Sequence, residues 1–422
     1  MLERYFVRPE TVDRIRALWL GSEIERYADS LSAQGYANRT VFRRVPLLAQ
    51  FTEFARAQGA AAIEDLPAHV EAFVTEWLGR ARPIRSGALA VGMAKEARGP
   101  IEQFLQLVVP GFAGSGRQHR VEPFAEVLPG FFDYLASERG LRPASLRFYR
   151  HQLRRFEAYL DRIGVRQLGE LSPALLNAFV AERAAAGMAR TTVRDACAAV
   201  RVLLRYAHRE GLLQADLSRT VEWPQAYRLT TIPRSISWTD VSKLLAAVDR
   251  RTSSGKRDYA ILLLLVTYGL RGREVAALTL DDIDWRHERL AVPERKAGHS
   301  SVFPLSASVG QALADYLQHG RPQTSDRHVF FRAVAPVQPI GPAAVSARAT
   351  HYLRKAGIDV IRPGSHTLRH TCIQRMVDAN FTLKTIGDFV GHRSPASTEI
   401  YAKVAVEALR QVALGDGEEA LP

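Results

Sequence analysis

The sequence has few cysteines and no long apolar run, and both absences narrow the class of protein. Cys197 and Cys372 are the two cysteines among 422 residues, and a chain of this size has no need of a disulfide framework. The longest apolar run, residues 259–270, predicts a buried helix, because a helix needs about 20 apolar residues to cross a bilayer. The first residues lack the apolar segment of a signal peptide. We therefore expect a protein of the reducing cytoplasm without a membrane anchor.

The composition is that of a globular protein with an excess of positive charge. Apolar residues make up 47% of the chain and charged residues 24%, and a chain of 422 residues is long enough for two or three domains. The net charge is +13 and the pI is about 10.0, so a polyanion is the expected partner. A membrane surface is the alternative, but the sequence shows no basic amphipathic anchor for it.

Clusters of Gly and Pro divide the sequence into zones. The first zone, residues 1–115, ends in a Gly-, Pro- and Arg-rich stretch at 78–123, which one short helical segment at 100–109 interrupts. The second zone, residues 124–223, is predicted to be helical, because its apolar residues recur at steps of three and four. The residues with this period are Leu146, Tyr149, Leu153, Phe156 and Leu160.

The third zone, residues 237–414, mixes helical and extended patterns. Ser237 and Asp240 form an S-x-x-D pattern, which predicts that a helix begins there. Short apolar segments within residues 280–305, separated by charged clusters, predict a small antiparallel sheet. Residues 415–422 are expected to form a frayed tail.

Residues of the first zone resemble residues of the second at an offset of 105. The aligned pairs are Thr40 with Ser145, Phe51 with Phe156, and Gly59 with Gly164. One hypothesis is that the first zone is a diverged copy of the second, which gives two tandem helical modules that clasp DNA. The alternative is two unrelated pairs of amphipathic helices of similar length, and the sequence leaves both open.

The segment "GSHTLRHTCIQRM", residues 364–376, combines polar and apolar helical faces. His366 and Arg369 are three residues apart and therefore share one face of a helix. Apolar residues at steps of four form a second face, which would bury the helix and fix its polar side chains. These apolar residues are Leu368, Cys372 and Met376.

Two other interpretations apply to the histidines of this segment. His366 and His370 have the spacing of a helical zinc motif, but Thr367 stands where such motifs carry a general-base glutamate, and no third ligand is evident. We therefore expect no metal. A purely structural role, in which the histidines form hydrogen bonds in the core, is the other interpretation for either residue taken alone.

Further motifs follow in a defined order around this segment. They are "TYGLRGREVAALTLDDID" at 267–284, "ERKAGH" at 294–299, and "GHRS" at 391–394 followed by Tyr401. Together they resemble the tyrosine recombinase family, also called the phage integrase family. The resemblance implies a multidomain, mainly α protein, whose catalytic domain contains a small antiparallel sheet and follows a helical core-binding domain.

The resemblance assigns a catalytic role to residues that match the family's motifs. The matching residues are Arg271, Lys296, His366, Arg369, His392 and the nucleophile Tyr401. Glu274 matches an acidic position that supports the first arginine. Arg273 and Val390 depart from the residues that are commoner at their positions, and neither departure predicts a loss of activity.

Elementary chemistry explains why a phenol needs these neighbours. A phenol has a pKa of about 10, so about one in a thousand is ionised at pH 7, a handicap of roughly 4 kcal/mol. His366 is suited to accept the proton of Tyr401, and guanidinium groups are suited to hold the oxygens of a phosphate. Lys296 is the natural proton donor to the leaving 5′ oxygen. These cations replace the metal ions of two-metal nucleases, so no cofactor is expected.

The same resemblance implies how the protein meets DNA. It implies a clamp around double-stranded DNA and a tetramer of recombinase protomers on two DNA sites. The arginines expected to contact phosphates from the second zone are Arg147, Arg150, Arg154, Arg155, Arg190 and Arg194. A solvated basic helix face is the alternative for them. The apolar residues Val404, Ala408 and Val412 would dock on the next protomer or on their own domain.

The predicted function is a site-specific DNA recombinase of integrase or transposase type, encoded by a mobile element. It would cut and rejoin strands through a 3′-phosphotyrosyl bond, without metal or ATP, in the cytoplasm and on the bacterial nucleoid when bound to DNA. Two alternatives are a type IB topoisomerase-like DNA relaxase and a DNA-binding accessory protein that has lost the reaction.

Overall fold

The structure is a computed structural model that describes most of the chain. The described residues are 2–80, 87–112, 114, 122–225, 235–293, 295, 300–391 and 398, with the backbone alone for 87–91. The Cα positions form two compact units, residues 113–230 and the remainder of the chain. Buried apolar side chains form three large clusters, one within residues 2–105, one within 124–221 and one within 241–368.

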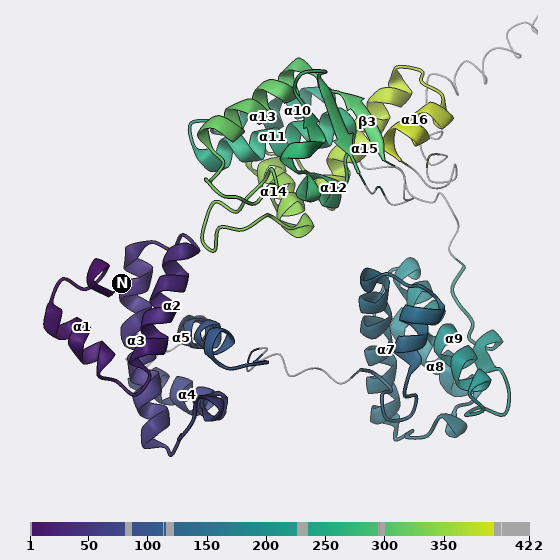
Figure 1. Ribbon diagram of the computed structural model, residues 1–422. Coiled ribbons are helices and arrows are strands. Elements are labelled where there is room, and N and C mark those ends of the chain that lie inside the picture. The colour runs from purple at the N-terminus through teal and green to yellow at the C-terminus, as the bar shows by residue number, and fades with distance from the viewer. Residues whose placement is uncertain are drawn as a thin grey trace, which may run out of the picture. The chain divides into compact units, whose positions relative to one another are not determined.

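The described residues up to Phe112 form a helical body (Figure 1). Its elements are η1 (Leu2–Arg4), α1 (Pro9–Arg16), α2 (Gly21–Ala33), α3 (Asn38–Ala57), η2 (Ile63–His69), α4 (Val70–Arg80) and α5 (Gly87–Val108). The short helix predicted at residues 100–109 is wrong in extent, because α5 begins at Gly87 and contains Pro100. Ala97, Ile101 and Phe104 are fully buried, and their packing outweighs the helix-breaking signals of Gly and Pro.

The second helical body contains the predicted amphipathic helix. Its elements are α6 (Phe131–Asp133), the π-helical turn η3 (Tyr134–Glu138), α7 (Pro143–Ile163), η4 (Leu168–Glu170), α8 (Pro173–Ala185), α9 (Arg190–Arg209) and η5 (Leu217–Arg219). On α7 the residues with the predicted period are buried or packed against the core. Pro143 begins α7 and Gly164, with a φ of 79°, ends it, which are the positions that each residue favours.

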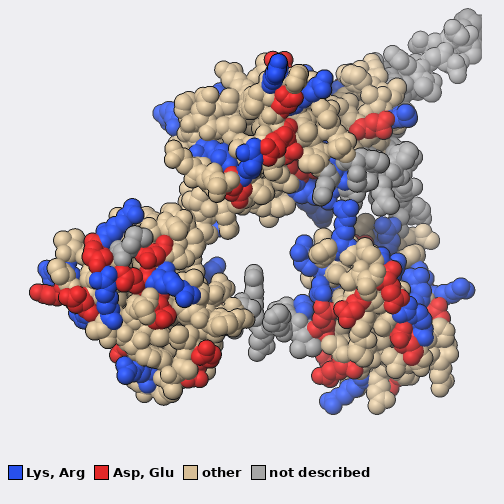
Figure 2. Space-filling view, viewed as in Figure 1, with Lys and Arg blue, Asp and Glu red and all other residues tan. Residues whose placement is uncertain are grey.

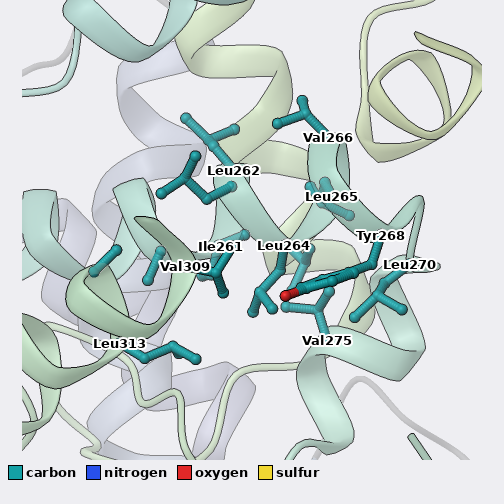
Figure 3. Close-up of a cluster of buried hydrophobic side chains, with 14 of the residues drawn as sticks. Ile261, Leu262, Leu264, Leu265, Val266, Tyr268, Leu270, Val275, Val309 and Leu313 are labelled. Atoms are coloured by element: carbon teal, nitrogen blue, oxygen red, sulfur yellow. The ribbon is translucent and has the colours of Figure 1, made fainter. Parts of the chain in front are cut away.

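The third body begins at the predicted capping residue, Ser237, whose Oγ accepts a hydrogen bond from the Asp240 backbone N at 3.0 Å. Its helices are α10 (Trp238–Ala246), α11 (Ser253–Tyr268), α12 (Gly272–Ala277), α13 (Ala307–His319), α14 (Pro342–Lys355), α15 (Ser365–Asp378) and α16 (Leu383–Val390). The apolar run predicted to be a buried helix is α11, and its side chains fill the centre of this body (Figure 3).

A three-stranded antiparallel sheet lies between α12 and α13 in the sequence. The short turn η6 (Leu280–Asp282) leads into β1 (Ile283–Asp284), which pairs with β2 (Arg289–Val292), and β2 pairs with β3 (Ser301–Pro304). In the register of β2 and β3, Leu290 lies opposite Phe303 and both are buried. The predicted fold class, mainly helical with a small antiparallel sheet, is confirmed. Across the described residues, no helix is long and apolar enough to cross a membrane.

Candidate active site

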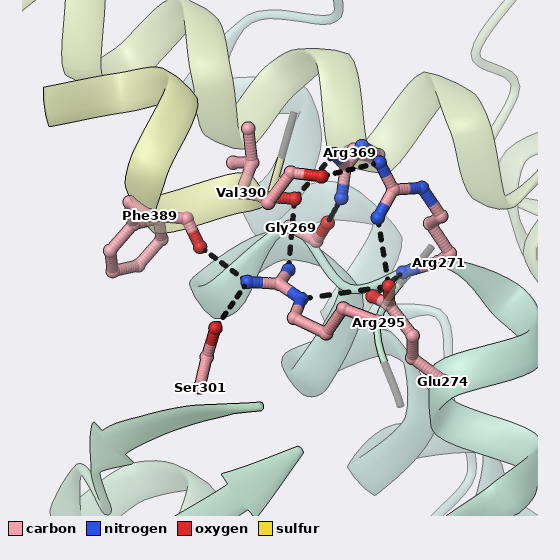
Figure 4. Close-up of polar contacts among 9 residues, drawn as sticks. Gly269, Arg271, Glu274, Arg295, Ser301, Arg369, Phe389 and Val390 are labelled. Carbon is pink, nitrogen blue, oxygen red and sulfur yellow. Dashed lines mark hydrogen bonds and ion pairs between the residues drawn. The ribbon is translucent and has the colours of Figure 1, made fainter. Parts of the chain in front are cut away.

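The start of α12 holds Arg271 and Glu274 together. Gly269 ends α11 with a φ of 59°, a left-handed conformation that suits glycine, and the chain then turns into α12. The Glu274 carboxylate accepts hydrogen bonds from the Arg271 backbone N and from Arg271 Nη1, both at 2.8 Å. Figure 4 shows this pair beside two further arginines. The carboxylate therefore fixes both the helix start and the direction of the Arg271 side chain.

A buried arginine from the β2–β3 connection also faces Glu274. The side chain of Arg295 is 1% exposed, and its Nε lies 3.6 Å from Glu274 Oε1. Its Nη1 donates to the Phe389 carbonyl at 2.7 Å, and its Nη2 donates to the Val390 carbonyl at 2.9 Å (Figure 4). The sequence does not single out Arg295, because an arginine within "ERKAGH" has the appearance of an exposed residue of a polar turn.

Three arginines converge on the last carbonyls of α16. Arg369 Nη2 donates to the Val390 carbonyl at 2.7 Å, and Arg271 Nη2 donates to the Gly391 carbonyl at 3.0 Å. With the two bonds from Arg295, every carbonyl from residue 389 to 391 accepts from a guanidinium group. The last carbonyls of a helix have no partner within it, and a cation there is favoured by the helix dipole. The residue that follows Gly391 in the sequence is His392.

The carboxylate and the arginines shift each other's pKa values. Burial alone would raise the pKa of Glu274, but the hydrogen bonds from Arg271 and the positive charge of Arg295 lower it overall. Glu274 is therefore ionised at neutral pH. Burial lowers the pKa of Arg295, and Glu274 opposes that shift. One carboxylate thus partly compensates two guanidinium groups, which leaves net positive charge at this end of the body.

His366 lies close enough to this cluster to feel the charges of Arg369 and Arg271, and the residue is exposed. It is the second residue of α15, three residues before the buried Arg369, as the sequence predicted. Partial desolvation lowers the pKa of His366, and the charges of Arg369 and Arg271 lower it further. The ring is therefore mainly neutral at pH 7, the state that accepts a proton.

The structure brings together only part of the predicted catalytic set. Arg271, Glu274 and Arg369 meet through hydrogen bonds and shared carbonyls, and His366 lies within their electrostatic reach. The other predicted residues, Lys296, His392 and Tyr401, lie outside the described residues. Within the described part of the chain, no group of three or more His, Cys, Asp or Glu side chains is arranged to hold a metal ion.

The predicted DNA-contacting arginines of the second body differ in their surroundings. Arg147, Arg190 and Arg194 are exposed, whereas Arg154 and Arg155 are half-buried. Arg150 Nε donates to Glu122 Oε1 at 2.9 Å, and its guanidinium lies 4.9 Å from the centre of the Phe132 ring. Its charge is therefore already balanced within the protein.

Comparison with known proteins agrees with this geometry. Residues 234–408 match the phage integrase family, and residues 128–211 match the N-terminal SAM-like domain of phage integrases. A protein of Sinorhizobium fredii named as the integrase/recombinase y4rF is 30% identical over 417 residues, which cover 98% of this chain and 95% of that protein. The tyrosine recombinase XerD of Mycobacterium tuberculosis is 29% identical over 310 residues, which cover 68% of this chain and 96% of XerD.

Solved structures show the same fold at low sequence identity. The recombinase XerH, in a post-cleavage complex with its difH substrate, matches with a TM-score of 0.55 and 14% identity over 83% of this chain and 96% of XerH. A lambda integrase dimer bound to a core site matches with a TM-score of 0.52 and 17% identity over 65% of this chain and 94% of that chain.

Fold and sequence together define a DNA strand-transferring enzyme. The chain belongs to the phage integrase family, the tyrosine recombinases.

Proposed function

We propose that this chain is a site-specific recombinase that attacks DNA with Tyr401 and forms a 3′-phosphotyrosyl bond. The observation that carries the proposal is the convergence of Arg271, Arg295 and Arg369 on the end of α16, beside a histidine held neutral. A buried, positively charged site of this kind suits a phosphate group whose negative charge grows as the reaction proceeds.

Each residue of the proposed site has a distinct role. Arg271 uses two of its five N–H donors within the described residues, so three remain to hold phosphate oxygens. Arg369, which donates to the Val390 carbonyl, adds a further positive charge. His366 takes the proton of Tyr401, and Lys296 gives a proton to the departing 5′ oxygen. One ester replaces another, so the step is close to thermoneutral and needs no ATP.

Arg295 is proposed as a positioning residue. Its guanidinium joins the β2–β3 connection, which contains Lys296, to the end of α16, which leads to His392. It also contacts the carboxylate that orients Arg271. One buried side chain thus links three stretches of sequence that carry proposed catalytic residues.

We also propose the domain organisation and the DNA partner. Residues 124–223 form a core-binding domain and 237–414 the catalytic domain, which together hold double-stranded DNA. Residues 1–115 form an accessory domain, and 415–422 a tail. The arginines proposed to contact phosphates are Arg147, Arg154, Arg155, Arg190 and Arg194, with a smaller contribution from Arg150. The protein would act in the cytoplasm, on the bacterial nucleoid.

An apolar groove on the catalytic body supports a proposed tetramer on two DNA sites. The groove has a volume of about 600 Å³ and lies between α10, α11 and α15. Trp238 and Phe381 at its border are 45% and 52% exposed, a large exposure for such apolar side chains. We propose that residues 404–412, whose apolar positions include Val404, Ala408 and Val412, dock there from a neighbouring protomer.

The test of the proposed reaction is a denaturing gel of protein incubated with nicked duplexes tiled across the DNA that flanks the gene. We expect a covalent protein–DNA adduct that Tyr401→Phe abolishes while DNA binding persists. An adduct that persists in Tyr401→Phe would refute the assigned nucleophile. Absence of any adduct on DNA that the protein binds would favour the accessory function instead.

A second measurement separates the recombinase from a topoisomerase-like relaxase. The same protein is incubated with two differently labelled DNA molecules that each form the adduct. A recombinase yields joint molecules between the two, and a single nick-and-reseal enzyme yields none. A third experiment mixes two proteins, one that lacks residues 404–412 and one that carries Tyr401→Phe. It tests whether residues 404–412 fill the groove of a neighbouring protomer or the groove of their own chain.

A further inference from the structure

The first two helical bodies share the order and spacing of their elements. The helix α3 begins at Asn38 and α7 at Pro143, and the turns η2 and η4 begin at Ile63 and Leu168. Each pair is 105 residues apart. Left-handed glycines recur at the same offset. Gly35 and Gly140 have φ angles of 76° and 58°, and Gly59 and Gly164 have φ angles of 97° and 79°.

The cores of the two bodies match as well. Leu48 on α3 and Leu153 on α7 are both fully buried. The ring of Phe51 meets Phe73 edge-on at 5.4 Å, and the ring of Phe156 meets Phe179 edge-on at 5.0 Å. Unrelated helix pairs would not share capping glycines, turns and an aromatic pair in register. We infer that residues 21–108 are a diverged copy of the second body.

The second body gathers like charges where α7 meets α8. His151, Arg154 and Arg155 lie within two turns of α7, and Arg183 comes from α8. Arg183 is half-buried, and two of its nitrogens, Nε and Nη2, are buried without a hydrogen-bond partner among the described residues. The adjacent acid, Glu182, forms an ion pair with Arg162 and still raises the pKa of Arg183. Buried donors without a partner are costly unless a ligand fills them.

Electrostatics support the same grouping. Desolvation lowers the pKa of His151, and the charges of Arg155, Arg183 and Arg154 lower it further. Desolvation also lowers the pKa of Arg183, Arg155 adds to that shift, and Glu182 opposes it. Arg155 and Arg183 therefore repel each other in the free protein, and an anion placed between them would relieve the repulsion.

We propose that His151, Arg154, Arg155 and Arg183 form a phosphate-binding site for the DNA backbone, and that the first body has lost this site. The proposal rests on the proposed DNA-binding function of the second body. Arg183 and His151 are the new members of the site, because the sequence pattern of α7 pointed only to arginines.

The first body carries neutral residues at all four matching positions. Pro46, Ala49 and Gln50 match His151, Arg154 and Arg155 at the offset of 105, and Trp77 matches Arg183 at the offset of 106 that also aligns Phe73 with Phe179. Phe42, which matches Arg147, stacks on Phe6 with ring centres 5.3 Å apart. The matching positions therefore carry no charge, although Arg43, Arg44 and Lys95 line a cavity next to Pro46, Gln50 and Trp77.

Residues 2–18 cover part of this face. An open cavity of about 330 Å³ is lined by Phe6, Ile15 and Leu18 and by Pro46 and Ala49, and its other lining residues are Thr11, Arg14, Gln50 and Glu53. Residues 1–112 also contain 14 basic and 13 acidic residues, nearly a balance. Figure 2 shows both signs mixed over the visible surface of this body. The N-terminal segment thus covers the part of this face that Pro46, Ala49 and Gln50 form.

The test compares equal losses of charge in the two copies, in the full chain. One variant combines Arg155→Gln with Arg183→Gln. The matched control combines Arg39→Gln with Arg56→Gln on α3, where both side chains are exposed. Binding to a short duplex of mixed sequence is measured over a range of salt concentrations. Each lost phosphate contact lowers the slope of log affinity against log salt by about 0.9, so the first variant lowers it by about 2 and the control leaves it unchanged.

Either of two results would overturn the proposal: a wild-type slope in the folded Arg155→Gln, Arg183→Gln protein, or an equal drop in the control. If the double variant does not fold, Arg155→Gln alone gives the same test with a drop of about 1. Replacing both arginines by lysine keeps the charge and should keep the slope. All variants are also assayed for the Tyr401 adduct at saturating DNA. An adduct together with an unchanged slope would reject this phosphate site and leave the proposed reaction standing.

Discussion

Two clusters of arginine in this molecule have opposite surroundings. In the catalytic body, Arg271, Arg295 and Arg369 donate to carbonyls at the end of α16, and Glu274 lies among them. In the second helical body, Arg155 and Arg183 have like-charged neighbours, and two nitrogens of Arg183 have no acceptor among the described residues. The first cluster is largely satisfied within the protein, and the second is not.

The difference shows how the same side chain serves two purposes. A buried charge with acceptors on several segments holds those segments together, and its removal leaves the acceptors unpaired. A guanidinium group with few acceptors within the protein can bind an external anion, and it then contributes to the affinity for DNA. The catalytic cluster should therefore control stability and rate, and the second-body cluster should control binding.

The largest effect should come from breaking the satisfied cluster at Arg295. Arg295→Ala removes the donors to the Phe389 and Val390 carbonyls and the second cation of Glu274. We expect the catalytic body to lose about 3–5 kcal/mol of unfolding free energy, the usual result of removing one partner of a buried ion pair. Hydrogen exchange of α15 and α16 in the full chain measures this loss.

Two controls accompany that change. Arg289→Ala removes an exposed arginine from β2 and should alter stability by less than about 0.5 kcal/mol. Arg295→Lys keeps the charge without the planar fork, and should restore part of the stability and part of the cleavage rate. A fully stable Arg295→Ala protein with normal cleavage would show that Arg295 positions nothing.

The next effect separates rate from affinity. Arg271→Lys should lower the rate of adduct formation at saturating DNA by about a hundredfold to a thousandfold, the usual cost of one transition-state donor. Its affinity for DNA should stay within a factor of a few of the wild type. Single-turnover cleavage and equilibrium binding, measured on the same variant, test this. A variant with weakened binding and an unchanged rate at saturation would contradict the assignment.

Lowering the pH should reduce the cleavage rate, which depends on the catalytic cluster, and should raise the DNA affinity, which depends on the second-body cluster. His366 must be neutral to accept a proton, and Arg369 and Arg271 lower its pKa, so the cleavage rate at saturating DNA should fall as the pH drops below the titration range of free histidine. His151 binds phosphate better when protonated, so DNA affinity should rise severalfold over the same drop in pH. In His151→Gln the affinity should lose this dependence while the rate keeps its own. If the cleavage rate and the DNA affinity fell together with pH in both the wild type and His151→Gln, the separate roles of His366 and His151 would be refuted.

The smallest effect should come from Arg150, an arginine of the second body that has partners within the protein, as the arginines of the catalytic cluster do. Arg150 is paired with Glu122 and lies over Phe132. Arg150→Gln should cost about 1 kcal/mol of stability, and should lower the salt slope by less than half of the drop caused by Arg147→Gln, which removes an exposed arginine. Equal drops in the salt slope for the two variants would show that Arg150 contacts phosphate despite its pairing with Glu122.

Sequence patterns predicted those features that depend on local periodicity and motif order. The cap at Ser237, the helix α7 and the small sheet were predictable, because each depends on residues close in the sequence. The pairing of Arg271 with Glu274 was expected from the family resemblance. The burial of Arg295 was not, since its partners are about 90 residues away in the sequence and its neighbours are polar.

Long-range packing also explains the other differences. The extent of α5 depends on a core that outweighs Pro100. Arg183 lies close enough to Arg155 of α7 for the charge of Arg155 to lower its pKa because α8 packs against α7, and the periodicity of the sequence does not reveal this packing. The internal similarity at an offset of 105 is visible in the sequence, but the contact of residues 2–18 with the uncharged positions of α3 depends on long-range packing.

The central claim is that the arginine cluster serves one phosphate attacked by Tyr401, and mapping the covalent bond tests it most directly. Trapped adduct is digested with protease and nuclease, and the peptide that carries a nucleotide is sequenced by mass spectrometry. We predict a nucleotide joined through a 3′ phosphate to Tyr401, with a free 5′ hydroxyl on the other DNA end. A nucleotide on any other residue, or a 5′ phosphate linkage, would contradict the account.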